Sequence, residues 1–96
     1  MAEAKYVEFK HGFEDRFNGG DVEVCYRFRR PTPQEMARAQ KSVLKDSGQA
    51  MRNLCLDLVH PEDKDRMVKE FEEWPGLPTT MGTAIFQSVG VGNLGN

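Results

Sequence analysis

The hydrophobic pattern changes near residue 30, and each part of the chain predicts a different kind of secondary structure. After the segment Asn18-Gly19-Gly20-Asp21, apolar and polar residues alternate with a period of two. The apolar positions are Val22, Val24, Tyr26 and Phe28, and the polar positions between them are Glu23, Cys25, Arg27 and Arg29. This alternation predicts a β-strand with one apolar face and one polar face.

The residues before that segment predict a pairing partner for the strand. Apolar side chains occur at Val7, Phe9, Phe13 and Phe17, and Gly12 interrupts their pattern. Asn and Gly tolerate the positive φ angles that tight hairpin turns require, so a turn is expected at residues 18–21. The first thirty residues are therefore predicted to form two or three antiparallel strands, with a bend or bulge at Gly12.

From Pro31 onwards the apolar spacing becomes helical. Thr32, Pro33 and Glu35 stand in the order N-cap, N1 and N3, which predicts a helix start closed by a capping box. The apolar residues of this first helix are Met36, Ala39, Val43 and Leu44. Asp46-Ser47-Gly48 interrupts the helix and is expected to cap a second one. The second helix has the most regular apolar stripe, formed by Met51, Leu54, Cys55, Leu58 and Val59.

Two further helices are predicted towards the end of the chain. His60-Pro61-Glu62-Asp63 resembles a helix start, with Pro at N1 and acidic residues in the first turn. The apolar residues that follow are Met67, Val68, Phe71 and Trp74, and Pro75-Gly76 ends the helix. A last helix, capped by Thr79 or Thr80 and followed by Gly90 as C′ residue, has the inward positions Leu77, Met81, Ala84, Ile85 and Val89. Phe86 falls off this stripe.

Strands followed by a run of helices predict an α+β fold. We expect an N-terminal antiparallel β-hairpin of two or three strands, followed by a bundle of about four short α-helices. Residues 1–90 are predicted to form one domain, because 96 residues are too few for two ordinary cores. Residues 91–96 are expected to form a flexible C-terminal tail.

Composition excludes several classes of protein. The formal net charge is -2, which argues against bulk binding to nucleic acid or to an anionic membrane. No apolar run approaches the ~20 residues of a membrane-spanning helix, and the first residues lack the apolar stretch of a signal peptide. Two cysteines do not make a disulfide framework. The protein is therefore expected in the cytoplasm.

No pattern of residues predicts a catalytic, cofactor or metal site. His11, His60, Cys25 and Cys55 are scattered, without the paired spacing that a structural zinc site needs. Cys55 lies on an apolar helix stripe, and no base is near Cys25 in the sequence. We therefore expect a protein that is not an enzyme and that holds no cofactor.

Arg27, Arg29 and Arg30 form a local basic cluster. Tyr26 and Phe28 lie between them, as in some surfaces that bind single-stranded nucleic acid. The strand alternation, however, places these aromatic residues on the face opposite the arginines. The cluster is a candidate for a charged contact with an acidic partner, or with the acidic third helix of a neighbouring subunit.

Three stretches between Arg30 and Gly90 resemble the bacteriophage tail assembly chaperones. The first is Arg30-Pro31-Thr32-Pro33-Gln34-Glu35, followed by Arg38-Ala39. The second is Leu54-x-Leu56-x-x-Val59-His60-Pro61-Glu62-Asp63. The third is Glu72-Glu73-Trp74-Pro75-Gly76-Leu77-Pro78, with Ala84-Ile85 and Gly90 after it. The resemblance covers about two thirds of the chain and lies in the order and spacing of helix boundaries.

The resemblance implies a protein that binds the tape-measure protein of a long-tailed phage or prophage. Such chaperones keep the tape measure soluble, help to recruit tail-tube subunits, and leave before the virion is mature. A tape-measure segment is a long amphipathic helix, which needs an apolar groove. The candidate partner-binding residues are Phe71, Trp74, Met81, Ile85, Phe86 and Val89. Exposed strands offer a second mode, edge pairing between subunits, so a homo-oligomer is also considered.

Two other functions stay open at the level of sequence. One is a structural tail or connector component of the virion, which would be found in purified particles. The other is a small nucleic-acid-binding regulator that uses Arg27, Arg29 and Arg30, whose affinity should fall steeply with salt.

Overall fold

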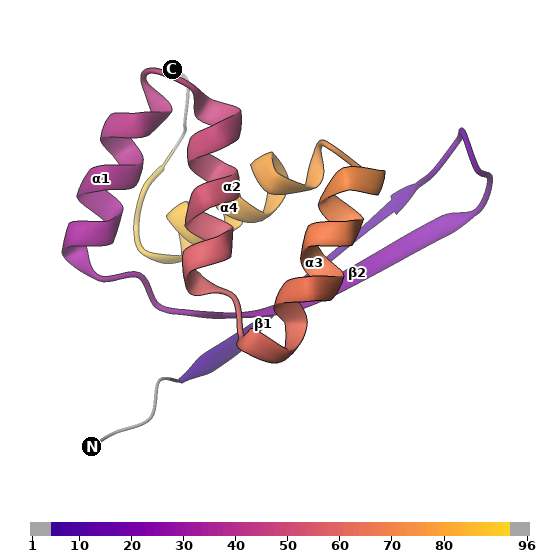
Figure 1. Ribbon diagram of the computed structural model, residues 1–96, viewed down its shortest axis with the longest axis horizontal. Helices are drawn as coiled ribbons and strands as arrows, with labels where there is room; N and C mark the ends of the chain where they lie inside the picture. Colours follow the sequence, from indigo (N-terminus) through magenta and orange to yellow (C-terminus); the bar gives the residue numbers. More distant parts are fainter. Residues whose placement is uncertain (1–4, 93–96) are drawn as a thin grey trace.

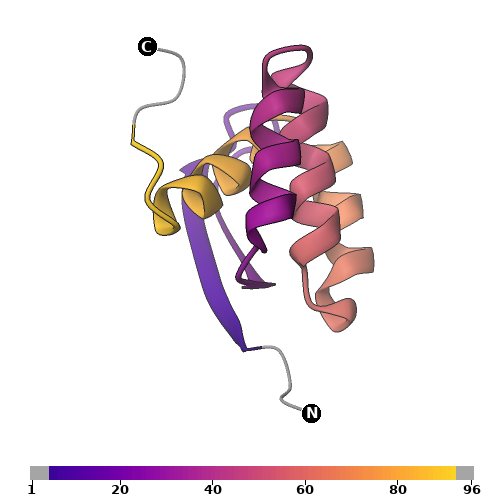
Figure 2. The same cartoon turned by 90° about the vertical axis from the view of Figure 1, so that its left-hand side faces the viewer.

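A computed structural model describes residues 5–92, and it confirms the predicted α+β fold. The elements are β1 (Tyr6–Glu14), β2 (Asp21–Arg29), α1 (Pro33–Val43), α2 (Ser47–Leu58), α3 (Pro61–Glu73) and α4 (Leu77–Ser88). Figure 1 shows the long hairpin passing behind α3, and Figure 2 shows α1, α2 and α3 side by side. No helix within the described residues is long and apolar enough to cross a membrane.

The two strands pair in one unbroken antiparallel register, from Tyr6 opposite Arg29 to Glu14 opposite Asp21. Gly12 lies directly opposite Glu23 within this register, so the predicted bulge at Gly12 is wrong. The connection between the strands uses Gly19 and Gly20 at φ angles of 84° and 98°, as the sequence predicts for this turn. A two-stranded sheet is marginal alone, so the hairpin depends on the helices packed against it.

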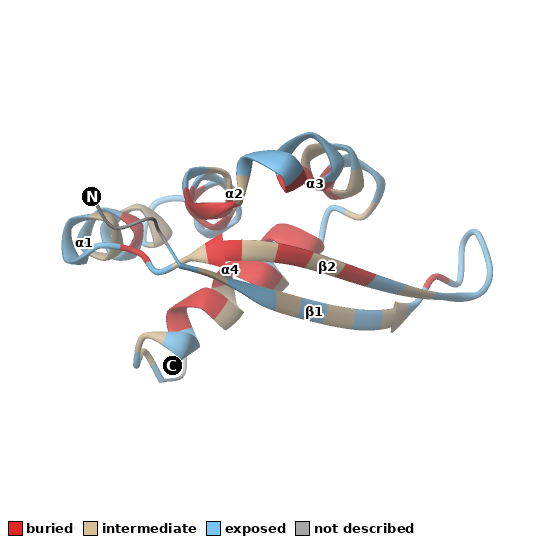
Figure 3. Ribbon diagram, turned by 90° about the horizontal axis from the view of Figure 1, so that it is seen from below, coloured by how far each residue is buried: buried red, intermediate tan, exposed pale blue. Residues whose placement is uncertain are grey.

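The predicted apolar face of β2 forms the centre of the core. Val24, Tyr26 and Phe28 are almost completely buried, whereas the corresponding side chains of β1 are only partly covered. Seen from below, α4 crosses behind the hairpin, and α1, α2 and α3 lie along the side of β2 (Figure 3). The hairpin therefore has one edge at β2 that is covered near Cys25 and Arg27, and one edge at β1 that no described element covers.

The covered edge of β2 is closed by the start of α3. His60 donates its backbone N–H to the carbonyl of Arg27 at 2.8 Å, and Asp63 accepts the backbone N–H of Arg27 at 2.9 Å. Arg66 donates to the carbonyl of Cys25 at 2.7 Å. These bonds satisfy the backbone groups that the edge of a sheet otherwise leaves without partners.

The predicted helix starts are confirmed for the first three helices. Thr32 and Glu35 form the capping box of α1, and Asp46 caps α2 by accepting the N–H of Gln49. His60 is the N-cap of α3 and accepts the N–H of Glu62 at its Nδ1. Leu44, which the sequence places among the apolar residues of the first predicted helix, follows the last turn of α1 and is 87% exposed.

More residues of helix α4 are buried than the predicted apolar stripe contains. It begins at Leu77 after Gly76, without a side-chain cap, so the predicted cap at Thr79 or Thr80 is wrong. Phe86 is 1% exposed although it lies off the stripe, because the helix is buried on more than one side. Gly82 lies against α2, and Ile85 lies near Phe9 of the hairpin.

The end of α4 has the predicted glycine. Gly90 has a φ of 103°, and its N–H bonds to the carbonyl of Gln87. Val91 then donates its N–H to Phe86 and packs against the core. This pair of bonds is the Schellman motif of a helix C-terminus. Residues 93–96 of the predicted tail lie outside the described residues.

Candidate functional site

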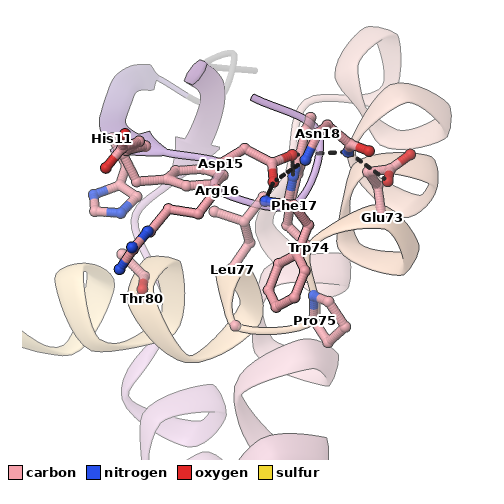
Figure 4. A pocket seen from close by; sticks show the side chains of 13 residues that line it. His11, Asp15, Arg16, Phe17, Asn18, Glu73, Trp74, Pro75, Leu77 and Thr80 are labelled. Carbon is pink, nitrogen blue, oxygen red and sulfur yellow. Dashed lines mark hydrogen bonds between the residues drawn. The ribbon is translucent and has the colours of Figure 1, made fainter. Parts of the chain in front are cut away.

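A pocket of about 610 Å³ lies between the tip of the hairpin and the junction of α3 and α4. We call it the tip pocket, and Figure 4 shows its lining. Its walls are His11 and Phe13 of β1, the turn residues Glu14, Asp15, Arg16, Phe17 and Asn18, and the junction residues Glu73, Trp74, Pro75, Gly76, Leu77 and Thr80. Two segments about sixty residues apart in the sequence therefore build one site.

Asp15 joins the two walls of the tip pocket. One carboxylate oxygen accepts the backbone N–H groups of Phe17 and Asn18, which fixes the turn. The other accepts Nδ2 of Asn18 at 2.8 Å and Nε1 of Trp74 at 2.9 Å. The bond from Trp74 is the main cause that lowers the pKa of Asp15 below its ordinary value. Asp15 thus stays ionised and orients the indole ring at neutral pH.

The apolar part of the tip pocket is aromatic and partly open to solvent. Phe13 and Trp74 meet edge to face, with ring centroids 5.6 Å apart. Trp74 is half-buried, and the side chain of Phe17 is fully exposed at the rim. Aromatic side chains in a concave, partly exposed setting suit the binding of an apolar segment from another molecule.

Replacing Asp15 with Ala is expected to release Trp74 from the turn. The indole N–H and two backbone N–H groups then bond to water, so the turn loosens and the tryptophan environment becomes more polar. Because the chain has a single tryptophan, its emission maximum reports this change directly, and we expect a red shift. The matched control is Asp21→Ala at the other end of the turn, which should leave the emission unchanged. An unshifted Asp15→Ala spectrum would contradict this role.

A second cavity, of about 490 Å³, lies near the opposite end of β1. Val7 and Phe9 line it together with Ile85 and Val89 of α4, and Val7 is 50% exposed. The apolar face of β1 is thus incompletely covered at both ends of α4.

Comparison with known proteins places the chain in a family. A family model described as a domain of unknown function, DUF6848, matches residues 7–96. The chain belongs to the DUF6848 family. The DUF6848 chain is also similar to the solved structure of uncharacterised protein rbstp2171 from Bacillus stearothermophilus. The sequence identity is 26% and the TM-score 0.71, with 90% of this chain and 88% of that chain covered. No curated protein matches the sequence.

Four of the predicted partner-binding residues belong to the core of the DUF6848 fold. Phe71, Met81, Ile85 and Phe86 are each 1–2% exposed. Side chains buried to this degree pack inside the fold, so the structure gives these four a packing role, and of the four only Ile85 also lines the second cavity. Apolar periodicity alone could not distinguish a buried face from a binding face. Trp74 and Val89 are half-buried and line the tip pocket and the second cavity, respectively.

The arginine cluster is largely engaged within the chain. Arg27 pairs with Asp63 at 3.0 Å and Glu62 at 3.1 Å, so the acidic third helix that it meets belongs to its own chain. Arg29 pairs with Glu35 at 2.8 Å and also donates to the carbonyl of Asp57. Each carboxylate raises the pKa of its arginine. Arg30 is exposed and lines the second cavity.

The remaining candidates for chemistry are not activated. Burial raises the pKa of Cys25, and it raises that of Cys55 to about 12, so both thiols are protonated at neutral pH. Among residues 5–92, no group of three or more His, Cys, Asp or Glu side chains could hold a metal ion. The residues that sequence reasoning missed are Asp15 and Phe17. A lone Asp before an Asn-Gly-Gly turn was the available signal, because such residues commonly bond to nearby backbone.

Proposed function

We propose that this DUF6848 protein is a phage or prophage tail assembly chaperone that binds the tape-measure protein. The observation that carries the proposal is the open aromatic tip pocket, with Phe17 exposed at its rim. Trp74-Pro75-Gly76-Leu77 forms one wall of the pocket and is also part of the stretch that resembles these chaperones. This segment therefore supports the proposal in two ways, by its resemblance to the chaperone sequences and by its place in the wall of the tip pocket.

The charge of the tip pocket suits a tape-measure segment with basic residues beside its apolar stripe. Glu14, Asp15 and Glu73 line the pocket, against a single arginine, Arg16. An amphipathic helix that places leucine or methionine against Phe13 and Trp74 would set its flanking lysines or arginines near these carboxylates. The protein would act in the cytoplasm of the host and be absent from the finished virion.

The alternative of a nucleic-acid-binding regulator loses support from the arginine contacts. Arg27 and Arg29 are neutralised by Asp63, Glu62 and Glu35, whereas binding to phosphates needs positive charge that is free to replace counterions. No observation specifically favours a structural component of the virion. Mass spectrometry of purified particles separates that function from the chaperone function, because only a structural component should be found there.

The proposal is tested by co-expression with the tape-measure protein encoded nearby, followed by size-exclusion chromatography of the soluble fraction. The wild-type protein is expected to keep the tape measure soluble and to co-elute with it. Phe17→Ser should reduce the co-eluting tape measure by about tenfold, because an aromatic anchor commonly contributes more than ~1 kcal/mol to an interface.

The matched control is Leu44→Ser. It also removes an exposed apolar side chain, but Leu44 lies after α1, outside the tip pocket. This variant should behave as the wild type does. A tape measure that stays insoluble, or that co-elutes equally well with Phe17→Ser, would overturn the proposed site.

A further inference from the structure

The nine-residue strand β1 has one edge that faces away from β2. Alternate residues of β1 direct their backbone N–H and C=O groups to this outer edge. The backbone groups of Cys25 and Arg27 point away from β1, towards α3. Because these directions alternate along a strand, Tyr26 and Phe28 bond to β1, and their partners there are Phe9 and Val7. The even-numbered residues of β1 therefore direct their N–H and C=O groups to the open edge.

We propose that a second copy of this chain pairs with this edge, β1 to antiparallel β1, about a twofold axis at Phe9. Two hairpins would then form one continuous four-stranded sheet. The inference does not rest on the proposed function: the seam shares His11 with the tip pocket, but Phe17 and Trp74 of the pocket lie outside the seam. The edge carries no proline, which would block such pairing.

Charge selects the register of this pairing. With Phe9 opposite Phe9 of the second copy, Glu8 of each copy lies opposite Lys10 of the other, so the seam has two opposite-charge pairs. A twofold axis at Lys10 would place lysine against lysine, and an axis at Glu8 would place glutamate against glutamate. A lysine in the middle of an edge strand ordinarily discourages pairing, and here the facing glutamate compensates it.

Apolar burial favours the same register. Phe9 would meet its own copy across the seam, and Val7 would meet His11 of the second copy. Val7 and Phe9 lie on the face of β1 that α4 covers incompletely. Val7 is 50% exposed and Phe9 is half-buried. Pairing therefore covers apolar surface as well as backbone groups.

The association stops at two copies. In each hairpin the other sheet edge, at β2, is closed at Cys25 and Arg27 by His60, Asp63 and Arg66. The rest of that edge, towards the turn, carries the acidic residues Asp21 and Glu23, whose like charges disfavour pairing with another copy. A twofold pairing of β1 with β1 is isologous and occupies the β1 edge of both copies, so it is closed and does not propagate into a fibre.

The experiment is sedimentation equilibrium of the whole chain over a wide range of concentration. The wild type should approach twice the chain mass of 10.9 kDa. Glu8→Lys and Lys10→Glu, each alone, should weaken the dimer by about tenfold or more, because each creates two like-charge pairs. The double variant Glu8→Lys/Lys10→Glu exchanges the charges and should restore dimerisation.

Control variants separate this seam from other effects. Lys41→Glu, an exposed charge reversal on α1, and Phe17→Ser, in the tip pocket, should both leave the dimer intact. Circular dichroism of each variant checks the fold, because Glu8 also lies opposite Arg27 within the hairpin. A wild type that stays monomeric at every concentration would overturn the inference. So would a double variant that is folded but associates no better than the single ones.

Discussion

Replacing Gly82 with Ala is expected to lower the free energy of unfolding by about 1–3 kcal/mol, because it overpacks the contact between α4 and α2. A Cβ atom at this position would lie 2.8 Å from Cβ of Met51, closer than two carbon atoms can approach. Met51 is buried, and because its Cβ is fixed to the backbone of α2, a change of rotamer cannot relieve this contact. The two helices would have to separate.

Urea unfolding measures this effect, and the thermal midpoint should fall by about 4–8 °C for each kcal/mol in a domain of this size. The matched control is Gly48→Ala in α2, where the nearest atom to an added Cβ is 3.8 Å away. That variant should be at least as stable as the wild type, because alanine is the better helix former and its Cβ meets no close neighbour. If Gly82→Ala is as stable as the wild type, the close packing of α4 on α2 is wrong.

Replacing Asp63 with Ala is expected to cost about 1–3 kcal/mol of stability, because it leaves polar groups of the β2 edge without partners. Asp63 is 8% exposed and accepts three bonds from Arg27: from its backbone N–H, from Nε and from Nη2. The exposed residue Asp65 on the same helix is the matched control, and Asp65→Ala should change stability much less.

The same carboxylates predict acid sensitivity. Bonds from Arg27 lower the pKa of Asp63 to about 2, and bonds from Arg29 lower that of Glu35 to about 2. The unfolded chain thus binds more protons than the folded protein in moderately acidic solution. The stabilisation is complete above about pH 5 and is lost as the pH falls towards 2. A double variant, Asp63→Ala/Glu35→Gln, should show a flatter dependence of the unfolding midpoint over this range. An equally steep curve would contradict the assignment.

Local sequence signals predicted the elements of this fold and most of their boundaries. The capping box at Thr32 and Glu35, the cap at His60 and the C′ glycine at Gly90 each act over a few residues, so the chain displays them directly. The alternation in β2 predicted its buried face for the same reason.

The features that the sequence did not predict at Phe86, at Arg27 and in the tip pocket depend on distant parts of the chain. Phe86 is buried because α4 is enclosed on more than one side, which its own periodicity does not show. Arg27 meets Asp63 within one chain, and the sequence could not distinguish this pair from a contact between subunits. The tip pocket depends on the bond between Asp15 and Trp74, which are separated by 59 residues. Sequence reasoning identified Trp74 but not its partner.

Fluorescence of Trp74 tests the proposed function most directly, because this single tryptophan lines the tip pocket. Peptides that cover the tape-measure protein are titrated into the protein, with scrambled peptides as controls. The account predicts a saturable change in emission for at least one apolar, basic peptide, and a much weaker response in Phe17→Ser. If the emission of Trp74 stays constant with every peptide, the tip pocket is not the chaperone site.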